Sequence, residues 1–245
     1  MAKPVIEFDN VTKSYGKRIV LKDFSLTAER GEIIAIIGRS GCGKTTLLKL
    51  VNGLLLPDTG DVYVRGLRVS EYNIIELRRN IGYVIQSIGL FPHLTVGKNI
   101  AYVPSLSGMW SRNAAKIEIE RLLDMVGLEP DFATRYPSEL SGGQCQRIGL
   151  ARALAAKPDI MLMDEPYGAV DEITRRILQD ELLRLISELN LTVLFVTHDI
   201  KEAIKLGSRI LVMDDGHVVQ VGTADEIIQS PANNFVRELL EIHRV

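Results

Sequence analysis

Residues 38–45 read Gly38-Arg39-Ser40-Gly41-Cys42-Gly43-Lys44-Thr45, and they directly follow the apolar run 33–37. This is the phosphate-loop pattern GxxxxGK(S/T), placed between a strand and a helix. Successive backbone N–H groups of such a turn converge on a phosphate at the positive end of the helix, and side chains at Gly41 and Gly43 would block that approach. The segment predicts a site for ATP in which Lys44 contacts the β- and γ-phosphates and Thr45 ligates Mg²⁺.

The length and composition of the chain indicate one large domain with a sizeable core. Of its 245 residues, 46% are hydrophobic. The formal net charge of -2 and the absence of a long Lys/Arg block argue against a nucleic-acid partner. The opening residues lack the apolar stretch of a signal peptide, and no apolar run approaches the roughly 20 residues that span a bilayer. We therefore expect neither a signal peptide nor a transmembrane segment.

The spacing of apolar residues predicts a strand-rich first third and an alternating last part. Strands are expected over residues 5–8, 19–26, 33–37, 61–65 and 82–85, in a partly antiparallel arrangement. Further strands at 160–163, 192–196 and 209–213 alternate with helices at 173–189 and 200–206, which favours a parallel sheet covered on both faces. Short helices are expected at 224–229 and 233–242.

Between these parts the pattern becomes helical, from residue 91 to about 156. Helical spacing is carried there by Ile119, Leu122, Leu123 and Val126. The later helix is expected to bury one face made of Leu178, Leu182, Leu185, Ile186 and Leu189. The fold class is thus predicted as α/β: a P-loop NTPase core with a mixed sheet, an N-terminal antiparallel β part and an inserted α-helical subdomain. We expect residues 1–86 and 157–245 to form the core and 87–156 the helical subdomain of a single domain over 1–245.

Three polar side chains follow two of the apolar strands. Asp164 and Glu165 come after the run 160–163, and His198 comes after the run 192–196. Because ligands bind at the carboxyl ends of parallel strands, we expect these side chains at one edge of the sheet. Asp164 is expected to hold Mg²⁺ through its water shell, and Glu165 to act as base for the attacking water. His198 is expected to bond the γ-phosphate and hold Glu165 in line; the alternative is an ordinary capping histidine.

With these residues the chain resembles the nucleotide-binding subunits of ABC transporters, essentially from residue 5 to 221. The resemblance rests on the phosphate loop extended to Thr46, on the Asp164-Glu165 pair, on His198, and on the signature Ser141-Gly142-Gly143-Gln144. It implies that Gln86 is the Q-loop glutamine, which helps to arrange the metal and the water. It also implies that Tyr15 stacks on adenine and that Asp171 belongs to the D-loop. The D-loop departs from its usual small-residue form, since it reads Tyr167-Gly168-Ala169-Val170-Asp171.

The resemblance also implies a homodimer, since in this family the signature segment caps the γ-phosphate bound by a second copy. Ser141 and the amides of Gly142 and Gly143 lead into a helix expected over 144–155, which offers another helix N-terminus for anionic oxygen. Two ATP molecules would lie between two such half-sites. Hydrolysis would then remove the groups that bridge the subunits.

Residues 82–103 resemble the corresponding stretch of osmoprotectant and quaternary-amine importers, whose substrates include glycine betaine, choline and carnitine. This implies integral membrane permease subunits that dock near residues 86–103, a solute-binding protein in the same system, and a place on the cytoplasmic face of the membrane. The apolar residues of this stretch are expected to form a groove for a coupling helix of a permease subunit; the alternative is that they belong to the core of the helical subdomain. These residues are Ile88, Leu90, Phe91 and Leu94. The chain ends before the pair of regulatory CBS modules that many members of that group carry, so ionic-strength sensing by this subunit is not expected.

Other functions remain open at this point. One is an importer ATPase for another solute, such as an amino acid or a phosphonate. A second is a soluble ABC ATPase that acts on nucleic acid, although such proteins usually join two domains or insert a long coiled coil. A third is a regulator that does not hydrolyse ATP.

The chain has two cysteines, Cys42 and Cys145, and both lie in glycine-rich motif segments. This placement fits a reducing compartment better than a disulfide scaffold, and both residues are expected to be small fillers. Cys42 lies beside Lys44 at a helix N-terminus. We therefore expect a depressed thiol pKa and sensitivity to oxidation at Cys42.

Overall fold

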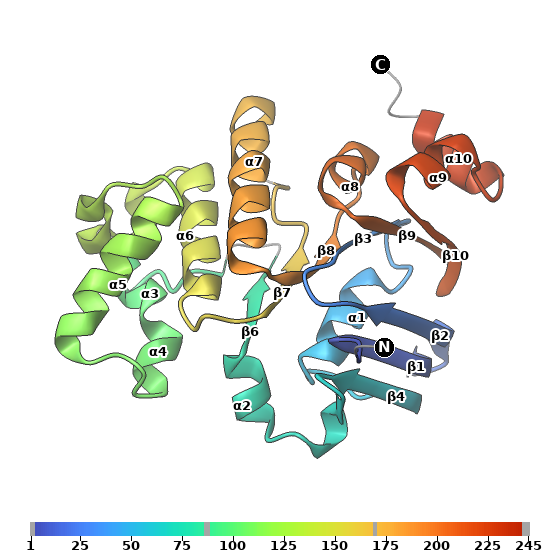
Figure 1. The fold of residues 1–245 in the computed structure, drawn as a ribbon, viewed down its shortest axis with the longest axis horizontal. Helices are drawn as coiled ribbons and strands as arrows, with labels where there is room; N and C mark the ends of the chain where they lie inside the picture. Colours follow the sequence, from blue (N-terminus) through green and yellow to red (C-terminus); the bar gives the residue numbers. More distant parts are fainter. Residues whose placement is uncertain (1–2, 86–88, 169–170, 242–245) are drawn as a thin grey trace. The chain divides into compact units, whose positions relative to one another are not determined.

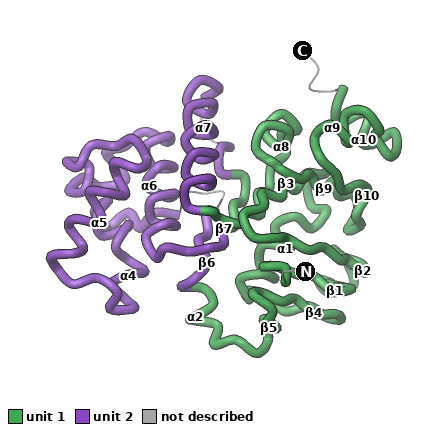
Figure 2. Tube along the Cα trace, in the orientation of Figure 1, with its two compact units in different colours: residues 1–78, 162–165, 190–245 green, residues 79–161, 166–189 purple. Residues whose placement is uncertain are grey.

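The computed structural model describes residues 3–85, 89–168 and 171–241, which form two compact units. The described residues of the first lie within Met1–Arg78, Leu162–Glu165 and Asn190–Val245, and those of the second lie within Arg79–Met161 and Pro166–Leu189 (Figure 2). The first unit carries the phosphate loop and the second carries the signature segment. Within the described ranges, none of the helices combines the length and hydropathy that a bilayer-spanning helix needs.

The first unit contains a small antiparallel sheet of β1 (Ile6–Tyr15), β2 (Arg18–Ala28), β4 (Thr59–Val64) and β5 (Leu67–Arg68), in the order β2-β1-β4-β5 (Figure 1). Apolar and polar residues alternate along β1, so that Phe8 is buried and packs edge-on against Phe24 with ring centroids 5.2 Å apart. The sequence analysis predicted that this strand ends at Phe8. The strand continues to Tyr15 through register shifts and a positive φ at Asn10, which break the alternation that the sequence pattern requires.

The larger sheet has six strands in the order β10-β9-β3-β8-β7-β6. They are β3 (Ile33–Gly38), β6 (Ile81–Val84), β7 (Ile160–Asp164), β8 (Thr192–Val196), β9 (Arg209–Asp214) and β10 (His217–Gly222). The strand β3 pairs in parallel with both β8 and β9, whereas β10 is antiparallel to β9, so the sheet is mixed. The predicted fold class is confirmed. The sequence analysis missed β10, because only Gly222 of this edge strand is buried and Gln220 interrupts its valines.

The helices of the first unit are short, and most begin at the carboxyl end of a strand. They are α1 (Lys44–Val51), α8 (Ile200–Leu206), α9 (Ala224–Gln229) and α10 (Asn234–Glu241), with the 3₁₀ turn η1 (Val69–Glu71) and α2 (Ile74–Arg79) at the unit's boundary. The sequence analysis expected no helix near residues 74–79. A single buried residue, Leu77, gives α2 too little apolar periodicity to be recognised.

The second unit confirms the helical character of residues 91–156 and divides it into several pieces. These are α3 (Val96–Ile100), α4 (Tyr102–Leu106), α5 (Arg112–Met125), η2 (Pro130–Thr134), η3 (Pro137–Glu139) and α6 (Gly142–Leu154), and α7 (Glu172–Leu189) belongs to the same unit. Leu122, Leu123 and Val126 are buried as their spacing predicted. On α7, Leu178, Leu182, Leu185 and Ile186 are buried, but the prediction for Leu189 was wrong. It is 44% exposed, because the helix ends at this residue.

Candidate functional site

The phosphate loop connects β3 to α1, and its shape depends on glycine. Gly43 caps α1 in the left-handed region, at φ 104°. A Cβ at Gly43 would lie 2.5 Å from the carbonyl oxygen of Val20, and a Cβ at Gly38 would lie 2.1 Å from that of Met213. The sequence analysis attributed Gly41 and Gly43 to the approach of a phosphate. At Gly38 and Gly43 the neighbouring backbone already requires glycine, whatever ligand is bound.

Lys44 is buried and folds back onto the loop that precedes it. Its Nζ donates to the carbonyl oxygens of Gly38, at 2.7 Å, and Arg39, at 2.9 Å. Ser40 and Gly41, at the tip of the loop, are exposed, whereas Thr46 behind them is buried. The ammonium group of Lys44 therefore bonds the backbone at the start of the loop, while the tip of the loop remains accessible to a ligand.

Thr45 and Asp164 face each other across the start of α1 and the end of β7. The Thr45 hydroxyl donates to Asp164 Oδ1 at 3.1 Å. Burial raises the pKa of the Asp164 carboxyl, and the hydrogen bond from Thr45 opposes that shift. A hydroxyl and a carboxylate at this distance are the oxygen ligands that Mg²⁺ prefers, so the donor set fits that ion.

The two strand ends after β7 and β8 bring Glu165 and His198 together. His198 Nδ1 lies 3.4 Å from Glu165 Oε2, and the N–H of Glu165 donates to the carbonyl oxygen of Val196 at 2.9 Å. Glu165 has a positive φ of 45°, unusual for a residue other than glycine. On the other side, Asp199 caps α8 by accepting from Lys201 N at 2.8 Å, which fixes the turn that carries His198. A carboxylate and an exposed imidazole in contact form a suitable pair for proton transfer.

Tyr15 lies at the end of β1, 48% exposed, where a ring can stack on a planar ligand. Its register partner on β2 is Arg18, whose Nη2 donates to the carbonyl oxygen of Gly41 at 3.3 Å. The sequence analysis missed Arg18 as a neighbour of the phosphate loop. The only signal was its position two residues after Gly16 of the predicted turn, and that signal does not say which loop the turn approaches.

The expectation for Cys42 was wrong. Cys42 is buried, and burial raises the pKa of its thiol, while the charge of Lys44 opposes the shift only in part. The pKa of Cys145 is also raised by burial. A raised pKa keeps the thiol protonated and unreactive, so Cys42 is a buried filler and the predicted oxidation-sensitive site is withdrawn.

The signature segment forms the N-terminus of α6 in the second unit. Ser141 is the N-cap: its hydroxyl accepts from Gln144 N at 3.3 Å, and its own N–H donates to Gln144 Oε1 at 2.9 Å. This is a capping box, in which both partners lie within one helical turn. Ser141 and Gly142 are exposed. The segment therefore presents a helix N-terminus whose shape is fixed by local contacts.

Asp171 has a similar local role at the start of α7. It accepts from Thr174 N at 3.1 Å, and this backbone hydrogen bond is the main reason that the pKa of the Asp171 carboxyl lies below its usual range. Gly143 packs close to the same turn, since a Cβ there would lie 3.1 Å from Thr174 Cγ2. The signature and Asp171 thus meet within the second unit. Gln86 and Ile88, and Ala169 and Val170 of the D-loop, lie outside the described residues.

The described part of the expected docking segment is a tight loop before α3. Buried Asn99 accepts from Phe91 N at 2.8 Å and donates to the carbonyl oxygens of Phe91, Leu94 and Thr95, each at 3.1 Å. The ring of Phe91 is half-buried and lies 4.6 Å from the ring of Tyr102, which is 37% exposed. This loop therefore presents a fixed surface that is partly aromatic.

Comparison with known proteins identifies the family. A family model described as "ABC transporter" matches residues 21–168. The glycine betaine/carnitine/choline transport ATP-binding protein OpuCA of Bacillus subtilis (strain 168) is 48% identical over 98% of this chain and 63% of its own length. The glycine betaine uptake system ATP-binding protein YehX of Escherichia coli (strain K12) is 46% identical over 96% of this chain and 76% of its own length. The chain spans less than two thirds of the length of the first of these relatives.

A solved structure agrees in fold as well as in sequence. It is a dimer of the ATP-binding cassette MJ0796 in a post-hydrolysis state, bound to ADP and Pi, and it superposes with a TM-score of 0.82. The sequences are 36% identical, over 89% of this chain and 98% of the other. The phosphate loop, the strand-end carboxylates and these similarities lead to one conclusion: the chain belongs to the ABC transporter family.

Proposed function

We propose that this chain is the ATP-binding and ATP-hydrolysing subunit of an ABC importer, which powers uptake of a compatible solute such as glycine betaine, choline or carnitine. The observation that carries the proposal is the grouping of the Lys44 loop, the Thr45-Asp164 pair and the Glu165-His198 pair within the first unit. The names of the relatives OpuCA and YehX support the solute class.

Nucleotide binding requires Lys44 to change partners. Its ammonium group bonds the carbonyl oxygens of Gly38 and Arg39, and it turns from these toward the β- and γ-phosphates of ATP. Backbone N–H groups of residues 38–46 complete the cradle at the N-terminus of α1. Tyr15 stacks on adenine. Bound Mg²⁺, held by Thr45 and Asp164 with help from Gln86, would neutralise charge on the phosphate oxygens.

Hydrolysis depends on Glu165 as the base that accepts a proton from the attacking water. His198 lies within 3.4 Å of its carboxylate, keeps that carboxylate oriented and donates a hydrogen bond to the γ-phosphate. The role of Gln86 is to help orient the water. A half-buried carboxylate at the end of β7 suits this role, because the neighbouring backbone bond to Val196 holds it in place.

The signature segment completes the site of a second copy in a nucleotide-sandwich homodimer. Ser141, Gly142, Gly143 and Gln144 form an exposed, self-capped helix N-terminus, which can bind a γ-phosphate from outside. Asp171 borders the same surface through Thr174. The dimeric state of the MJ0796 cassette supports this arrangement.

The remaining partners are two integral membrane permease subunits, which dock near residues 86–103, and a solute-binding protein of the same system. The chain would thus work at the cytoplasmic face of the membrane. In functional terms we divide the single ATPase domain into a core, 1–86 with 157–245, and a helical subdomain, 87–156, that carries the signature.

Transport in reconstituted vesicles tests this proposal. The chain is co-purified with its membrane subunits, and phosphate release and uptake of labelled glycine betaine, choline and carnitine are measured, with an amino acid and a phosphonate as comparison solutes. We expect one quaternary amine to stimulate both signals, and Lys44→Ala to abolish both. Stimulation only by a comparison solute would refute the solute class, and absence of phosphate release with every solute would refute the ATPase.

The homodimer has a separate test. A Glu165→Gln variant saturated with Mg-ATP should sediment as a dimer, and addition of Ser141→Arg should return it to the monomer, because a large cation then blocks the helix N-terminus. A Glu165→Gln variant that remains monomeric, both alone and in the membrane complex, would refute the sandwich.

A further inference from the structure

The side chain of Arg39, the second residue of the phosphate loop, is 63% exposed and contacts two residues of the C-terminal part of the first unit. Its Nη1 lies 3.6 Å from Asp214 Oδ2. Its Cζ lies 4.7 Å from the centroid of the Phe235 ring, over the ring face. No pattern in the sequence linked residue 39 to either position. Arg39 is thus clamped between a carboxylate and an aromatic ring.

The sheet places Asp214 beside the loop. Because β3 and β9 pair in parallel with Gly38 opposite Met213, Arg39, the residue after β3, lies beside Asp214, the last residue of β9. The contact between Gly38 and the carbonyl oxygen of Met213 leaves no room for a Cβ. The start of the loop is therefore fixed against the end of β9 by both backbone and charge.

A separate set of contacts places Phe235. Gln220 of β10 donates through Nε2 to the carbonyl oxygen of Ser230 at 2.9 Å, and its Oε1 accepts from Ala232 N at 2.8 Å. These two bonds hold the turn between α9 and α10 against the sheet. The helix α10 then begins with Asn233 Oδ1 accepting from Val236 N at 3.0 Å.

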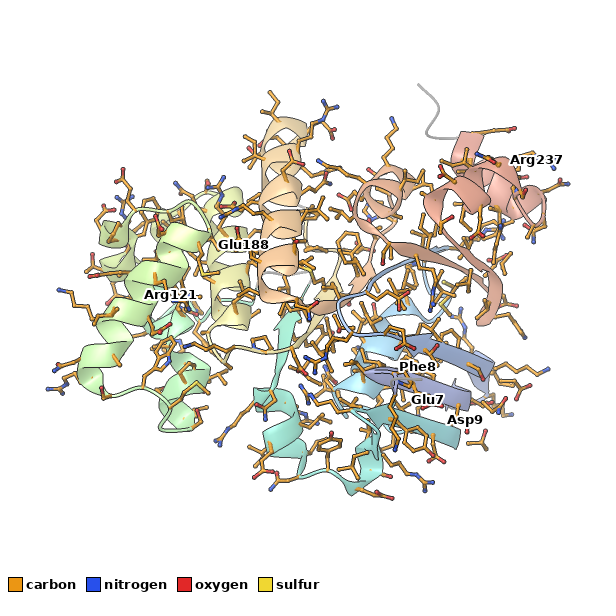
Figure 3. The ribbon with its side chains drawn as sticks, in the orientation of Figure 1. Glu7, Phe8, Asp9, Arg121, Glu188 and Arg237 are labelled. Carbon is orange, nitrogen blue, oxygen red and sulfur yellow. The ribbon has the colours of Figure 1, made fainter. Side chains whose placement is uncertain are left out.

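The buried residue of α10 fixes the orientation of the helix. Val236 is 1% exposed, whereas the side chain of the next residue, Arg237, is exposed and donates to Asn234 Oδ1 of the same helix at 3.2 Å (Figure 3). With Val236 facing the core, the ring of Phe235 is directed to Arg39. The position of the Phe235 ring therefore depends on the packing of α10 against the rest of the first unit.

The backbone of Arg39 connects this clamp to the lysine that binds phosphate. Its carbonyl oxygen accepts from Lys44 Nζ at 2.9 Å and from Cys42 N at 3.3 Å. A change in the position of Arg39 would therefore move both the lysine and the turn that carries the phosphate-binding amides. A loop that is already ordered loses less conformational entropy when the nucleotide binds.

We propose that Phe235 is a positioning residue of the phosphate loop: with Asp214 it holds Arg39, so that the affinity for ATP depends on docking of α10. This inference rests on the proposed function and adds regulation of the same site from the C-terminal helix. Detachment of α10 lowers the affinity for ATP. The chemistry at Glu165 is left unchanged.

Titration of the whole chain with Mg-ATP tests the inference. Phe235→Ala is expected to weaken binding about two- to fivefold, as for loss of a cation–π contact at an exposed site. Phe235→Trp retains a ring face and should restore the affinity to within about twofold. The control is Arg237→Ala, which changes an exposed residue of the same helix without touching the loop and should leave the affinity unchanged.

A double-variant cycle separates positioning from a general effect on folding. In an Arg39→Ala background, Phe235→Ala should have no further effect on the affinity, because its contact is already absent. In the membrane complex, Phe235→Ala should raise KM for ATP and leave kcat unchanged. Asp214→Asn, a nearly isosteric change, should weaken ATP binding by a similar factor even if Phe235→Ala lowers the unfolding temperature.

Two results would overturn the inference. One is an unchanged affinity in Phe235→Ala, and the other is an equal loss from Phe235→Ala with and without Arg39. If the unmodified chain fails to bind Mg-ATP, the proposed function is itself refuted, and the inference with it. Binding by the unmodified chain with no difference among the variants refutes the inference alone.

Discussion

The phosphate loop and the signature segment are both glycine-rich turns that lead into a helix, but different contacts hold them. Gly38 touches Met213 and Gly43 touches Val20, partners distant in sequence. The signature is held by the reciprocal bonds of Ser141 and Gln144, three residues apart. The phosphate loop depends on the surrounding sheet, whereas the signature depends on its own helical turn.

In the proposed function, this difference separates a site that performs chemistry from a surface that recognises a second copy. The lysine of the phosphate loop is buried, and the loop is braced by β9, β2 and α10, which allows charged groups to be placed accurately. Ser141 and Gly142 of the signature are exposed, and its proposed role requires only that it present helix amides. Substitutions near the phosphate loop should therefore have large effects on catalysis and folding, and those in the signature should have modest effects on the isolated chain.

The largest expected effect concerns turnover on the phosphate-loop side. Glu165→Gln should preserve ATP binding and slow phosphate release by a factor on the order of 10² to 10⁴, the usual contribution of a positioned base. Phosphate release and ATP binding are measured in the membrane complex. The control is Glu188→Gln on α7, an exposed carboxylate whose partner is Arg184 at 3.2 Å (Figure 3). Normal turnover in Glu165→Gln would show that Glu165 is not the catalytic base.

The next largest effect is expected on stability, where one glycine of the phosphate loop is compared with one glycine of the signature segment. Gly38→Ala places a Cβ 2.1 Å from a backbone carbonyl at a positive φ, and should lower the free energy of unfolding by about 2–5 kcal/mol. Gly143→Ala meets only the Thr174 methyl group at 3.1 Å and gains helix propensity, so the change should be below about 1 kcal/mol. Denaturant unfolding of the two variants gives both values. Equal destabilisation would contradict the proposed difference between the two turns.

A smaller effect concerns the cap of the signature helix. Ser141→Ala removes the acceptor for Gln144 N and should cost about 1 kcal/mol of stability. Thr223→Ala is the matched control, because Thr223 forms the same capping box with Glu226 at the start of α9. Similar losses in the two variants would support a local origin of the signature's shape. A loss at Ser141 several times larger would indicate tertiary contacts that the described residues do not include.

The smallest effect is expected at Asp164 and depends on pH. Burial raises the pKa of Asp164, so the folded chain holds this proton more tightly than the unfolded chain does. The stabilising contribution of the protonated group is therefore present at acidic pH and is lost as pH rises through the folded pKa. Asp164→Asn still accepts from Thr45 and should raise stability at neutral pH without nucleotide or metal. Unfolding at acidic and neutral pH measures this, and a variant less stable at both would contradict it.

Strong patterns in the sequence predicted most of the fold. The buried strands β3, β7, β8 and β9 are short apolar runs followed by turn or polar residues, and their order along the chain indicated a parallel sheet. Exposed or irregular elements were missed, including β10 and α2. Each of them buries too few residues to give a clear periodic spacing of apolar residues in the sequence. The bulged continuation of β1 was missed for a similar reason.

The candidate site was predicted in its residue types and less well in their surroundings. The motif spacing placed Glu165 and His198 at one sheet edge, and the structure brings them within 3.4 Å. The expectation for Cys42 failed because proximity to Lys44 is visible in the sequence, whereas burial of the thiol is not, and burial dominates its pKa.

The sequence by itself determined the phosphate-loop segment, the carboxylates and histidine after the buried strands, and the self-capped signature turn. Each of these depends on residues that are neighbours along the chain, and local geometry is encoded locally. Only the tertiary structure decided that Met213 leaves no room for a side chain at Gly38, and that Asp214 and Phe235 hold Arg39. Those contacts join residues that are 175 to 196 positions apart in the chain, and parallel pairing of β3 with β9, together with docking of α10, brings them together.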